Sequence, residues 1–241
     1  MFYIKIAEIN VGIDNKYPYL KRLCSDYLTD CVTPDLTVAV TEEQIKAEQA
    51  DSLSTGVVAS APYAESICMY REICNRIHEY DAFLFHASVI ECDGRSYAFA
   101  AASGTGKSTH TGLWLKHFGE RARIINGDKP IMRFVNGELR AYGTPWCGKE
   151  GYNINDSSPL AAVCFLERGK TNTIRQLESD ESVMRLFPQV LLPTDESAID
   201  LLFPLIEKMI DTIPCYCLAC TISDEAVTVA YNAMSKGAQD K

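Results

Sequence analysis

Long apolar runs, a secretion signal and clusters of basic residues are all missing from this sequence of 241 residues. No run approaches the roughly 18 consecutive apolar residues of a membrane-spanning helix, and residues 1–5 lack the basic and then apolar order of a signal peptide. No basic cluster exceeds two residues and the formal net charge is −9, which disfavours a nucleic-acid backbone as a partner. We therefore expect a cytoplasmic protein that binds neither membrane nor nucleic acid, and the sequence leaves a homo-oligomer open.

A zinc site also lacks support. The chain has 10 cysteines, among them Cys215, Cys217 and Cys220, but no second Cys/His pair lies at zinc-finger spacing. Cys215 and Cys217 share one face of an expected strand, so the default interpretation of this stretch is a buried core strand. Without an export signal, we interpret the cysteines as reduced thiols that serve as small apolar side chains.

The apolar content of 47% is enough for one large α/β domain or two small ones. No internal repeat or low-complexity tract appears. We divide the chain into an N-terminal α/β extension, residues 1–80, packed on a core domain, residues 81–241. In the extension we expect His78 at the surface or at a helix end, and the following elements: strands 2–7 and 36–40, helices 19–28 and 64–80, a capping-box helix start at 41–44 and a loop at 51–61.

The most informative stretch is the phosphate-binding loop pattern of residues 103–109. Its glycines allow successive backbone N–H groups to point at one anion, Lys107 adds a positive charge for the outer phosphates, and Ser108 offers a hydroxyl to Mg²⁺. The general pattern has an earlier glycine where this chain has Ala101. We predict that the phosphates are bound by Ser103, Gly104, Thr105, Gly106, Lys107, Ser108 and Thr109.

The neighbouring sequence supports this interpretation. Residues 97–101 are typical of a buried strand and residues 109–118 of a helix, which is the strand, loop and helix order that the motif needs. Asp93-Gly94 predicts a hairpin between strands 83–90 and 96–101, so the loop follows the second strand of a hairpin. The alternative is a Gly/Ser-rich turn with an incidental lysine.

Several polar residues follow predicted strands. Asp128 comes after strand 122–125, where a metal contact or a catalytic base would lie. Asn136-Gly137 predicts a second hairpin, between strands 131–135 and 138–142. Residues 143–152 are rich in glycine, include Lys149 beside Glu150, and are typical of a mobile lid or substrate loop.

The remaining elements complete an α/β pattern. We expect strands 160–166, 173–177 and 215–222, and helices 179–192, 197–213 and 224–234, with Pro188 and Pro204 kinking or splitting the first two helices. Several alternatives stay open: His110 could reach a nucleotide or lie at the surface, and Trp146 and Tyr152 could stack on adenine or pack the lid.

Three pieces of this sequence together resemble the catalytic core shared by HPr kinase/phosphorylase and ATP-dependent phosphoenolpyruvate carboxykinase. The resemblance covers roughly residues 83–177. In both families a histidine precedes the loop and an acidic pair follows the next strand, in the same order as here. The pieces are Phe85-His86-Ala87-Ser88, Ser103-Gly104-Thr105-Gly106-Lys107-Ser108 and Asn126-Gly127-Asp128. The resemblance implies an α/β fold with a mixed sheet, a hairpin-fed phosphate loop and flanking helices.

The resemblance also implies roles for individual residues. Lys107 would contact the β- and γ-phosphates, Ser108 and Asp128 would hold the metal, and His86 would lie beside the metal or the transferred phosphoryl group. A core histidine is the alternative for His86. Further roles come from the segment after the second hairpin and from the strand beyond it: Lys149 and Glu150 would touch phosphate or metal, and Arg168 would neutralise charge in the transition state.

This chain departs from the resembled families in two respects. HPr kinases carry two adjacent aspartates where this chain has Gly127-Asp128, or Asp128-Lys129 if shifted by one position. Asp128 must then take one of the two duties alone, or Glu150 must take the other. Residues 1–80 do not resemble the usual HPr-kinase N-terminal domain, so HPr need not be the substrate. The chain is also much shorter than a carboxykinase and lacks the large N-terminal domain that helps bind oxaloacetate, which disfavours a lyase reaction.

The sequence therefore predicts an ATP-dependent kinase, with Mg²⁺, that phosphorylates a hydroxyl of a protein, a peptide or a small molecule. Two alternatives stay open. One is a nucleotide-binding regulator that has lost transfer chemistry, and the other is a phosphorylase or lyase that uses pyrophosphate or phosphoenolpyruvate.

Overall fold

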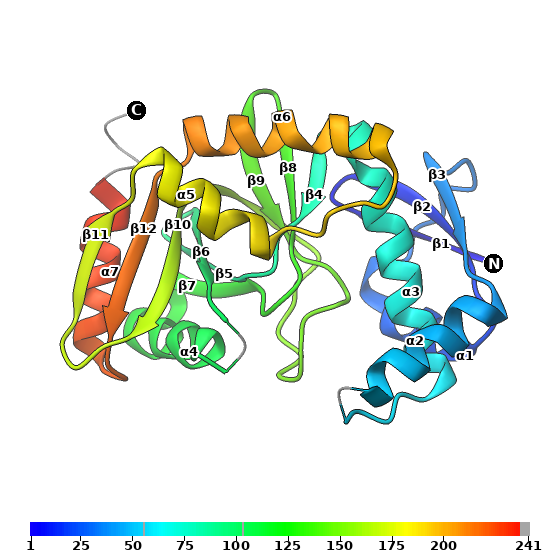
Figure 1. Ribbon diagram of the computed structural model, residues 1–241, viewed down its shortest axis with the longest axis horizontal. Coiled ribbons are helices and arrows are strands. Elements are labelled where there is room, and N and C mark those ends of the chain that lie inside the picture. Colours follow the sequence, from blue (N-terminus) through cyan, green and yellow to red (C-terminus); the bar gives the residue numbers. More distant parts are fainter. Residues whose placement is uncertain (55, 103, 237–241) are drawn as a thin grey trace.

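The computed structural model describes residues 1–54, 56–102 and 104–236 as a mixed α/β structure with two sheets (Figure 1). A three-stranded sheet belongs to the N-terminal 80 residues, and a curled nine-stranded mixed sheet belongs to the rest. Within the described ranges, no helix has both the length and the apolar character needed to cross a membrane.

The N-terminal elements form a small α/β unit. Strand β2 pairs antiparallel with β1 and parallel with β3, and the predicted capping box is confirmed because Thr41 and Gln44 exchange hydrogen bonds at the start of α2. Apolar side chains of this unit share one hydrophobic cluster with residues of the large sheet such as Ile131 and Tyr142. The elements are β1 Phe2–Ile6, β2 Ile9–Asp14, α1 Pro18–Leu23, η1 Ser25–Tyr27, β3 Leu36–Ala39, α2 Glu42–Ser54, α3 Ala61–Arg76 and η2 Ile77–Tyr80.

The large sheet has the strand order β4-β8-β9-β10-β6-β5-β7, with β12 pairing with β10 and β11 with β12. Strands β6, β10 and β12 are parallel, and most other pairs are antiparallel. Both predicted hairpins are confirmed, since β5 pairs with β6 and β8 with β9. The strands are β4 Ala82–Leu84, β5 Ser88–Cys92, β6 Arg95–Ala100, β7 Ala122–Asn126, β8 Ile131–Val135, β9 Glu138–Tyr142, β10 Ser157–Arg168, β11 Thr173–Gln176 and β12 Cys215–Cys220.

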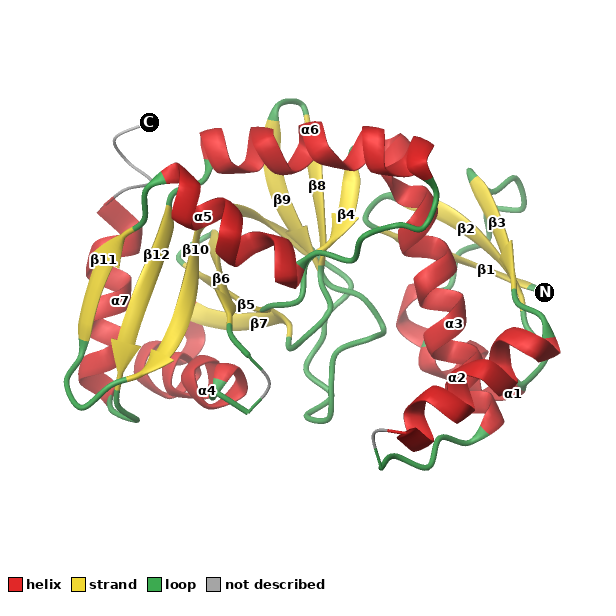
Figure 2. Cartoon of the chain, viewed as in Figure 1, coloured by secondary structure: helices red, strands yellow, loops and turns green. Residues whose placement is uncertain are grey.

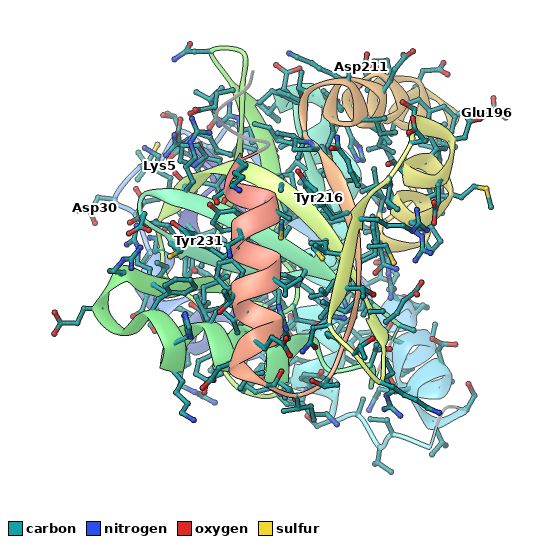
Figure 3. All side chains as sticks on the ribbon, turned by 90° about the vertical axis from the view of Figure 1, so that its left-hand side faces the viewer. Lys5, Asp30, Glu196, Asp211, Tyr216 and Tyr231 are labelled. Atoms are coloured by element: carbon teal, nitrogen blue, oxygen red, sulfur yellow. The ribbon has the colours of Figure 1, made fainter. Side chains whose placement is uncertain are left out.

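Helices cover both faces of this sheet (Figure 2). Trp114 of α4 and Met234 of α7 lie in one apolar cluster, and Leu186 of α5 and Leu202 of α6 lie in a second one. Figure 3 looks onto α7, where Tyr231 contacts Trp114 of α4. The helices are α4 Lys107–Phe118, η3 Gly119–Arg121, α5 Ser179–Leu186, η4 Phe187–Gln189, α6 Glu196–Thr212 and α7 Asp224–Lys236.

The strand predicted over residues 83–90 is wrong as one unit, because the chain changes partners in its middle. β4 pairs with β8, whereas β5 pairs with β6 and β7. Between them the backbone N–H of Phe85 donates to the carbonyl of Pro130 at 3.3 Å, and that of His86 donates to Gln189 at 2.7 Å. These outside partners satisfy the backbone where the strand is interrupted, and they hold His86 at a break rather than within a strand.

Other differences have simple physical reasons. Strand β2 was not predicted, and α2 runs to Ser54, into the region expected to be a loop. Helix α6 continues through Pro204, because its buried face of Leu202, Leu205, Ile206 and Met209 packs on the sheet and compensates for the lost hydrogen bond. His78 lies at a helix end, in η2 directly after α3, but it is 4% exposed and not at the surface.

Three backbone segments meet at Gly143. The backbone N–H of Ile154 donates to the carbonyl of Ile125 in β7, and the N–H of Gly143 donates to Asp156. A Cβ on Gly143 would stand 1.8 Å from the carbonyl oxygen of Ile154 and 2.8 Å from that of Ile125. Only a glycine leaves space for the three backbone segments to meet here.

We expect Gly143→Ala to lower the free energy of unfolding by about 3 kcal/mol or more, because the added methyl group overlaps backbone atoms that cannot rotate away. Gly112→Ala is the matched control: this helical position has open space around its Cβ, and alanine there should be neutral or stabilise by up to about 1 kcal/mol. Denaturant titration followed by circular dichroism measures both. Equal unfolding curves for the two variants would contradict the close approach at Gly143.

Candidate functional site

The described part of the loop after β6 contains two glycines with positive φ. Gly104 and Gly106 have φ of +76° and +117°, values that side chains with a Cβ rarely adopt, and α4 begins directly afterwards at Lys107. The N–H groups of the first turn of α4 have no partners within the helix, so this end is suited to an anion. Ser103, also predicted to bind phosphate, lies outside the described residues.

Lys107 points back towards the strand break. Its Nζ lies 3.2 Å from Nε2 of His86 and donates to the carbonyl of Ala101 at 3.4 Å. The pKa of Lys107 is lowered overall, chiefly by burial and also by Lys129, although nearby Asp128 raises it. A partly desolvated ammonium group interacts more strongly with an anion than a fully hydrated one.

Asp128 completes a cluster with His86 and Lys129. Its Oδ1 lies 2.9 Å from Nε2 of His86, and its Oδ2 accepts a hydrogen bond from Nζ of Lys129 at 2.5 Å. Burial raises the pKa of Asp128, but the hydrogen bonds from His86 and Lys129 outweigh it and hold the pKa well below its usual value. The carboxylate is therefore ionised at neutral pH.

Nε2 of His86 lies within hydrogen-bond distance of both Oδ1 of Asp128 and Nζ of Lys107. If Nε2 carries a proton, it donates to Asp128 and cannot accept from Lys107. If Nε2 is unprotonated, it accepts from Lys107. An anion that drew Lys107 away would leave His86 free to donate to Asp128, so anion binding and the tautomer of His86 are coupled.

Asn126 at the end of β7 fixes the direction of Asp128. Its Oδ1 accepts hydrogen bonds from the backbone N–H groups of Asp128 at 2.9 Å and Lys129 at 2.7 Å, which is an Asx-type turn. Its Nδ2 donates to the carbonyls of Thr144 at 3.1 Å and Trp146 at 3.3 Å. This buried side chain thus ties the acidic turn to the segment after β9.

That segment, residues 143–152, is only partly exposed. Thr144, Trp146 and Cys147 are buried, and exposure begins at Gly148. The ring of Trp146 stacks on Tyr70 of α3 at 4.2 Å between centroids, and its Nε1 donates to the carbonyl of Ser66. Trp146 therefore packs against the N-terminal unit, and a lid role stays a prediction for the exposed half.

A cleft of about 1080 Å³ connects these elements, above the range of about 300–1,000 Å³ for small-molecule sites. One side carries His86, Lys107, Ser108, Asp128, Lys129 and the loop glycines. The opposite wall comes from α1, η1 and α3, with Tyr19, Leu23, Asp26, Tyr63, Ser66 and Ile67. Sequence reasoning found no site residue in the N-terminal unit, since these residues follow no motif and only the fold brings them to the loop.

Position 127 has no room for a side chain. A Cβ on Gly127 would lie 2.8 Å from the carbonyl oxygen of Cys147. Glu150 nevertheless brings a second carboxylate to the cleft. Gly148 lies between the two carboxylates: a Cβ on Gly148 would stand 3.5 Å from Cγ of Asp128 and 3.7 Å from Oε2 of Glu150. Lys149 and Glu150 are both exposed and line the cleft.

Two predicted positions lie elsewhere. Arg168 ends β10, on the side of β6 opposite β5, and its Nη2 donates to the carbonyl of Gly104 at 2.9 Å. It lines a second cavity and does not join Lys107 and Asp128 in the cleft. His110 is buried, accepts a hydrogen bond from Nε1 of Trp114 at 3.0 Å, and belongs to the packing of α4 rather than to either cavity.

The site also contains a residue that the motif analysis missed. Lys129 contributes the shortest contact to Asp128, and the carbonyl of Lys129 accepts hydrogen bonds from Tyr70 and Thr144. Its position directly after Asp128 was the available signal. Among the described residues, no group of three or more His, Cys, Asp or Glu side chains is arranged to hold a metal ion.

The geometry defines a mixed α/β protein with a lysine, a histidine and a carboxylate gathered at a helix start. Residues 64–228 match the family model described as SynChlorMet cassette protein ScmC, and the chain belongs to that family. Among solved structures it is similar to the Hpr(Ser) kinase/phosphatase from Coxiella burnetii, at 10% identity and a TM-score of 0.38, over 64% of this chain and 97% of that one. A likeness at this level transfers no activity to this chain. The comparison with curated proteins finds no match.

We expect acid to lower the free energy of unfolding through His110 of α4. Burial lowers the pKa of this histidine to about 4. In the unfolded chain His110 takes up its proton near pH 6.5. Its contribution to the free energy of unfolding is therefore complete above about pH 6.5 and is lost as the pH falls towards 4, by up to about 3 kcal/mol. His110→Gln, which still offers an acceptor to Trp114, should flatten this part of the profile.

Unfolding free energies between pH 4 and 7.5 measure the effect. His117→Gln on the exposed side of the same helix is the control and should keep the parent profile. Parallel profiles for the parent and His110→Gln would exclude His110 as the source.

Proposed function

We propose that this chain is an ATP-dependent phosphotransferase that moves the γ-phosphoryl group to a hydroxyl. The observation that carries the proposal is the cluster of Lys107, His86 and Asp128 at the start of α4, inside a large cleft. The sequence resemblance described above supports it. The family description names a cassette but no reaction, so the proposal rests on the site.

The donor side is formed by the loop and α4. Backbone N–H groups at the helix start and the ammonium of Lys107 would bind the β- and γ-phosphates. Mg²⁺ prefers oxygen ligands and usually keeps only one or two protein carboxylates beside the phosphates, and the hydroxyl of Ser108 with the carboxylate of Glu150 fits this donor set, which leaves Asp128 to act as the base. When bound, the metal would neutralise phosphate charge.

The acceptor side is the opposite wall. In phosphoryl transfer, the attacking and leaving oxygens lie roughly in line on either side of phosphorus. With the leaving oxygen held at α4, the attacking hydroxyl must come from across the cleft, where Tyr19, Leu23 and Tyr63 lie. We therefore assign acceptor selection to the N-terminal unit.

Asp128 is the group that would receive the proton. The acceptor oxygen forms a bond to the γ-phosphorus, the bond from phosphorus to the β–γ bridging oxygen breaks, and the hydroxyl proton passes to the carboxylate and then to solvent. A carboxylate with a lowered pKa is a weak base, which suits a loose transition state in which positioning and charge stabilisation dominate.

A second candidate is a nucleotide-binding regulator without transfer activity. The contact between Lys129 and Asp128 favours it, because an ammonium group already neutralises the carboxylate that would act as the base. The two candidates differ in turnover and agree on nucleotide binding, so they are separated by measuring both.

Lys107→Ala should weaken Mg-ATP binding by about 10- to 100-fold, because it removes a charge-assisted contact worth about 1.5–3 kcal/mol. Isothermal titration calorimetry on parent and variant measures the change, with circular dichroism to confirm folding. Lys116→Ala, exposed on the same helix, is the matched control and should bind like the parent. Parent-like affinity in Lys107→Ala would disprove the phosphate-loop assignment.

Asp128→Asn should keep Mg-ATP affinity within a few-fold but lower phosphoryl transfer by about 10²- to 10⁴-fold, since the proton acceptor is lost. Glu150→Gln tests the second carboxylate and should give a smaller loss. Rates are measured with γ-labelled ATP and water, serine peptides or polyols as acceptors, with the exposed Glu120→Gln as control. A parent that binds Mg-ATP but transfers to none of these would favour the regulator.

A further inference from the structure

The second cavity lies on the other side of the phosphate loop. Its volume is about 490 Å³, within the range of about 300–1,000 Å³ for small-molecule sites. Its lining comes from three elements far apart in sequence: the loop after β6, the end of β10, and the α5–η4 region. The carboxyl ends of the neighbouring parallel strands β6 and β10 meet here, which is where open α/β sheets bind ligands.

The chemistry of this cavity changes across its length. Beside the loop, Arg168 is held in place by the carbonyl of Gly104. Farther along, the lining includes apolar side chains of Phe165, Met184 and Pro188. Arg185 lies over the ring of Phe165 at 6.0 Å, and its charge is compensated by two carboxylates: Glu167 at 2.8 Å and Glu181 at 2.9 Å. The cavity thus offers an available cation at the loop and apolar surface beyond it.

Gln189 adds a polar group that lacks a partner. Its Oε1 is buried without a hydrogen bond, although the residue lines the cavity. A buried acceptor without a donor is uncommon and unfavourable. The backbone carbonyl of Gln189 accepts the N–H of His86, so one residue lies between both cavities. If the end of the side chain turned towards the second cavity, Oε1 could accept an N–H of a ligand bound there.

The two cavities lie on opposite sides of β6. His86 and Asp128 lie beside β5 and β7, whereas Arg168 ends β10 on the other side of the loop. An extended polyphosphate bound along the loop, with its outer phosphate at Lys107, directs its other end towards Arg168. The group attached to that end must be largely apolar and must carry a hydrogen-bond donor.

We infer that the second cavity is the nucleoside subsite of the donor, with an amino-bearing purine whose exocyclic N–H donates to Oε1 of Gln189 and an inner phosphate beside Arg168. This inference rests on the proposed function. The selection of the nucleobase is thereby assigned to η4 and the end of β10. The whole first cleft is left to the outer phosphate and the acceptor.

The test compares three Mg-bound probes by calorimetry on the folded full chain: ATP, ITP and inorganic tripolyphosphate. ITP replaces the 6-amino group with a carbonyl, and tripolyphosphate lacks the nucleoside. The parent should bind ATP about tenfold more tightly than ITP, a difference of about 1.4 kcal/mol. Gln189→Leu should remove that preference while leaving tripolyphosphate affinity unchanged, because the backbone carbonyl that binds His86 remains.

Met184→Ala removes an exposed apolar part of the lining and should weaken both nucleotides about threefold, again with no effect on tripolyphosphate. Leu201→Ala, exposed on α6 and away from both cavities, is the matched control. An unchanged preference for ATP in Gln189→Leu, or an equal loss for all three probes, overturns the nucleoside subsite alone. If the parent binds none of the probes, the phosphate loop itself is wrong and the subsite falls with it.

Discussion

The hydrogen bonds that hold the Asp128 carboxylate between His86 and Lys129 are the interaction on which the cleft depends. A half-buried carboxylate is costly unless donors surround it. The donors come from two separate parts of the chain, because His86 lies at a break between strands and Lys129 lies in the turn that Asn126 shapes. Asn126 also binds the segment after β9, so the position of the carboxylate and the course of that segment depend on each other.

The charges that line the cleft are balanced, whereas the chain as a whole is negative. The chain carries a formal net charge of −9, which repels anions at long range. The cleft nevertheless contains Lys107, Lys129 and Lys149, together with the N-terminal end of α4. An anion bound as we propose would depend on short-range contacts inside a partly desolvated site, where each charge interacts more strongly than it does in bulk water. Two carboxylates beside these lysines keep the site compatible with a divalent cation as well as with phosphate.

The loop after β6 borders both cavities. The larger cleft faces the N-terminal unit, and the smaller cavity faces η4 and the end of β10. Gln189 contacts both, through its backbone to His86 and through its side chain to the second cavity. The backbone of this residue therefore contacts the border of the first cleft, while its side chain belongs to the second cavity.

Local patterns in the sequence determined the hairpins, the strand before the loop, helix α4 and the glycine backbone of the loop, because turn residues, apolar periodicity and glycine act over a few positions. They also pointed to Lys107 and Asp128, while the family resemblance pointed to His86, and the fold brings His86 within hydrogen-bond distance of both. Only the tertiary structure decided that the strand breaks at His86, that α6 continues through Pro204, and that Arg168 faces a second cavity. It also decided that α1 and α3 form the opposite wall of the cleft. Each of these depends on partners far away in the chain, whose contacts outweigh local preference and leave no trace in neighbouring residues.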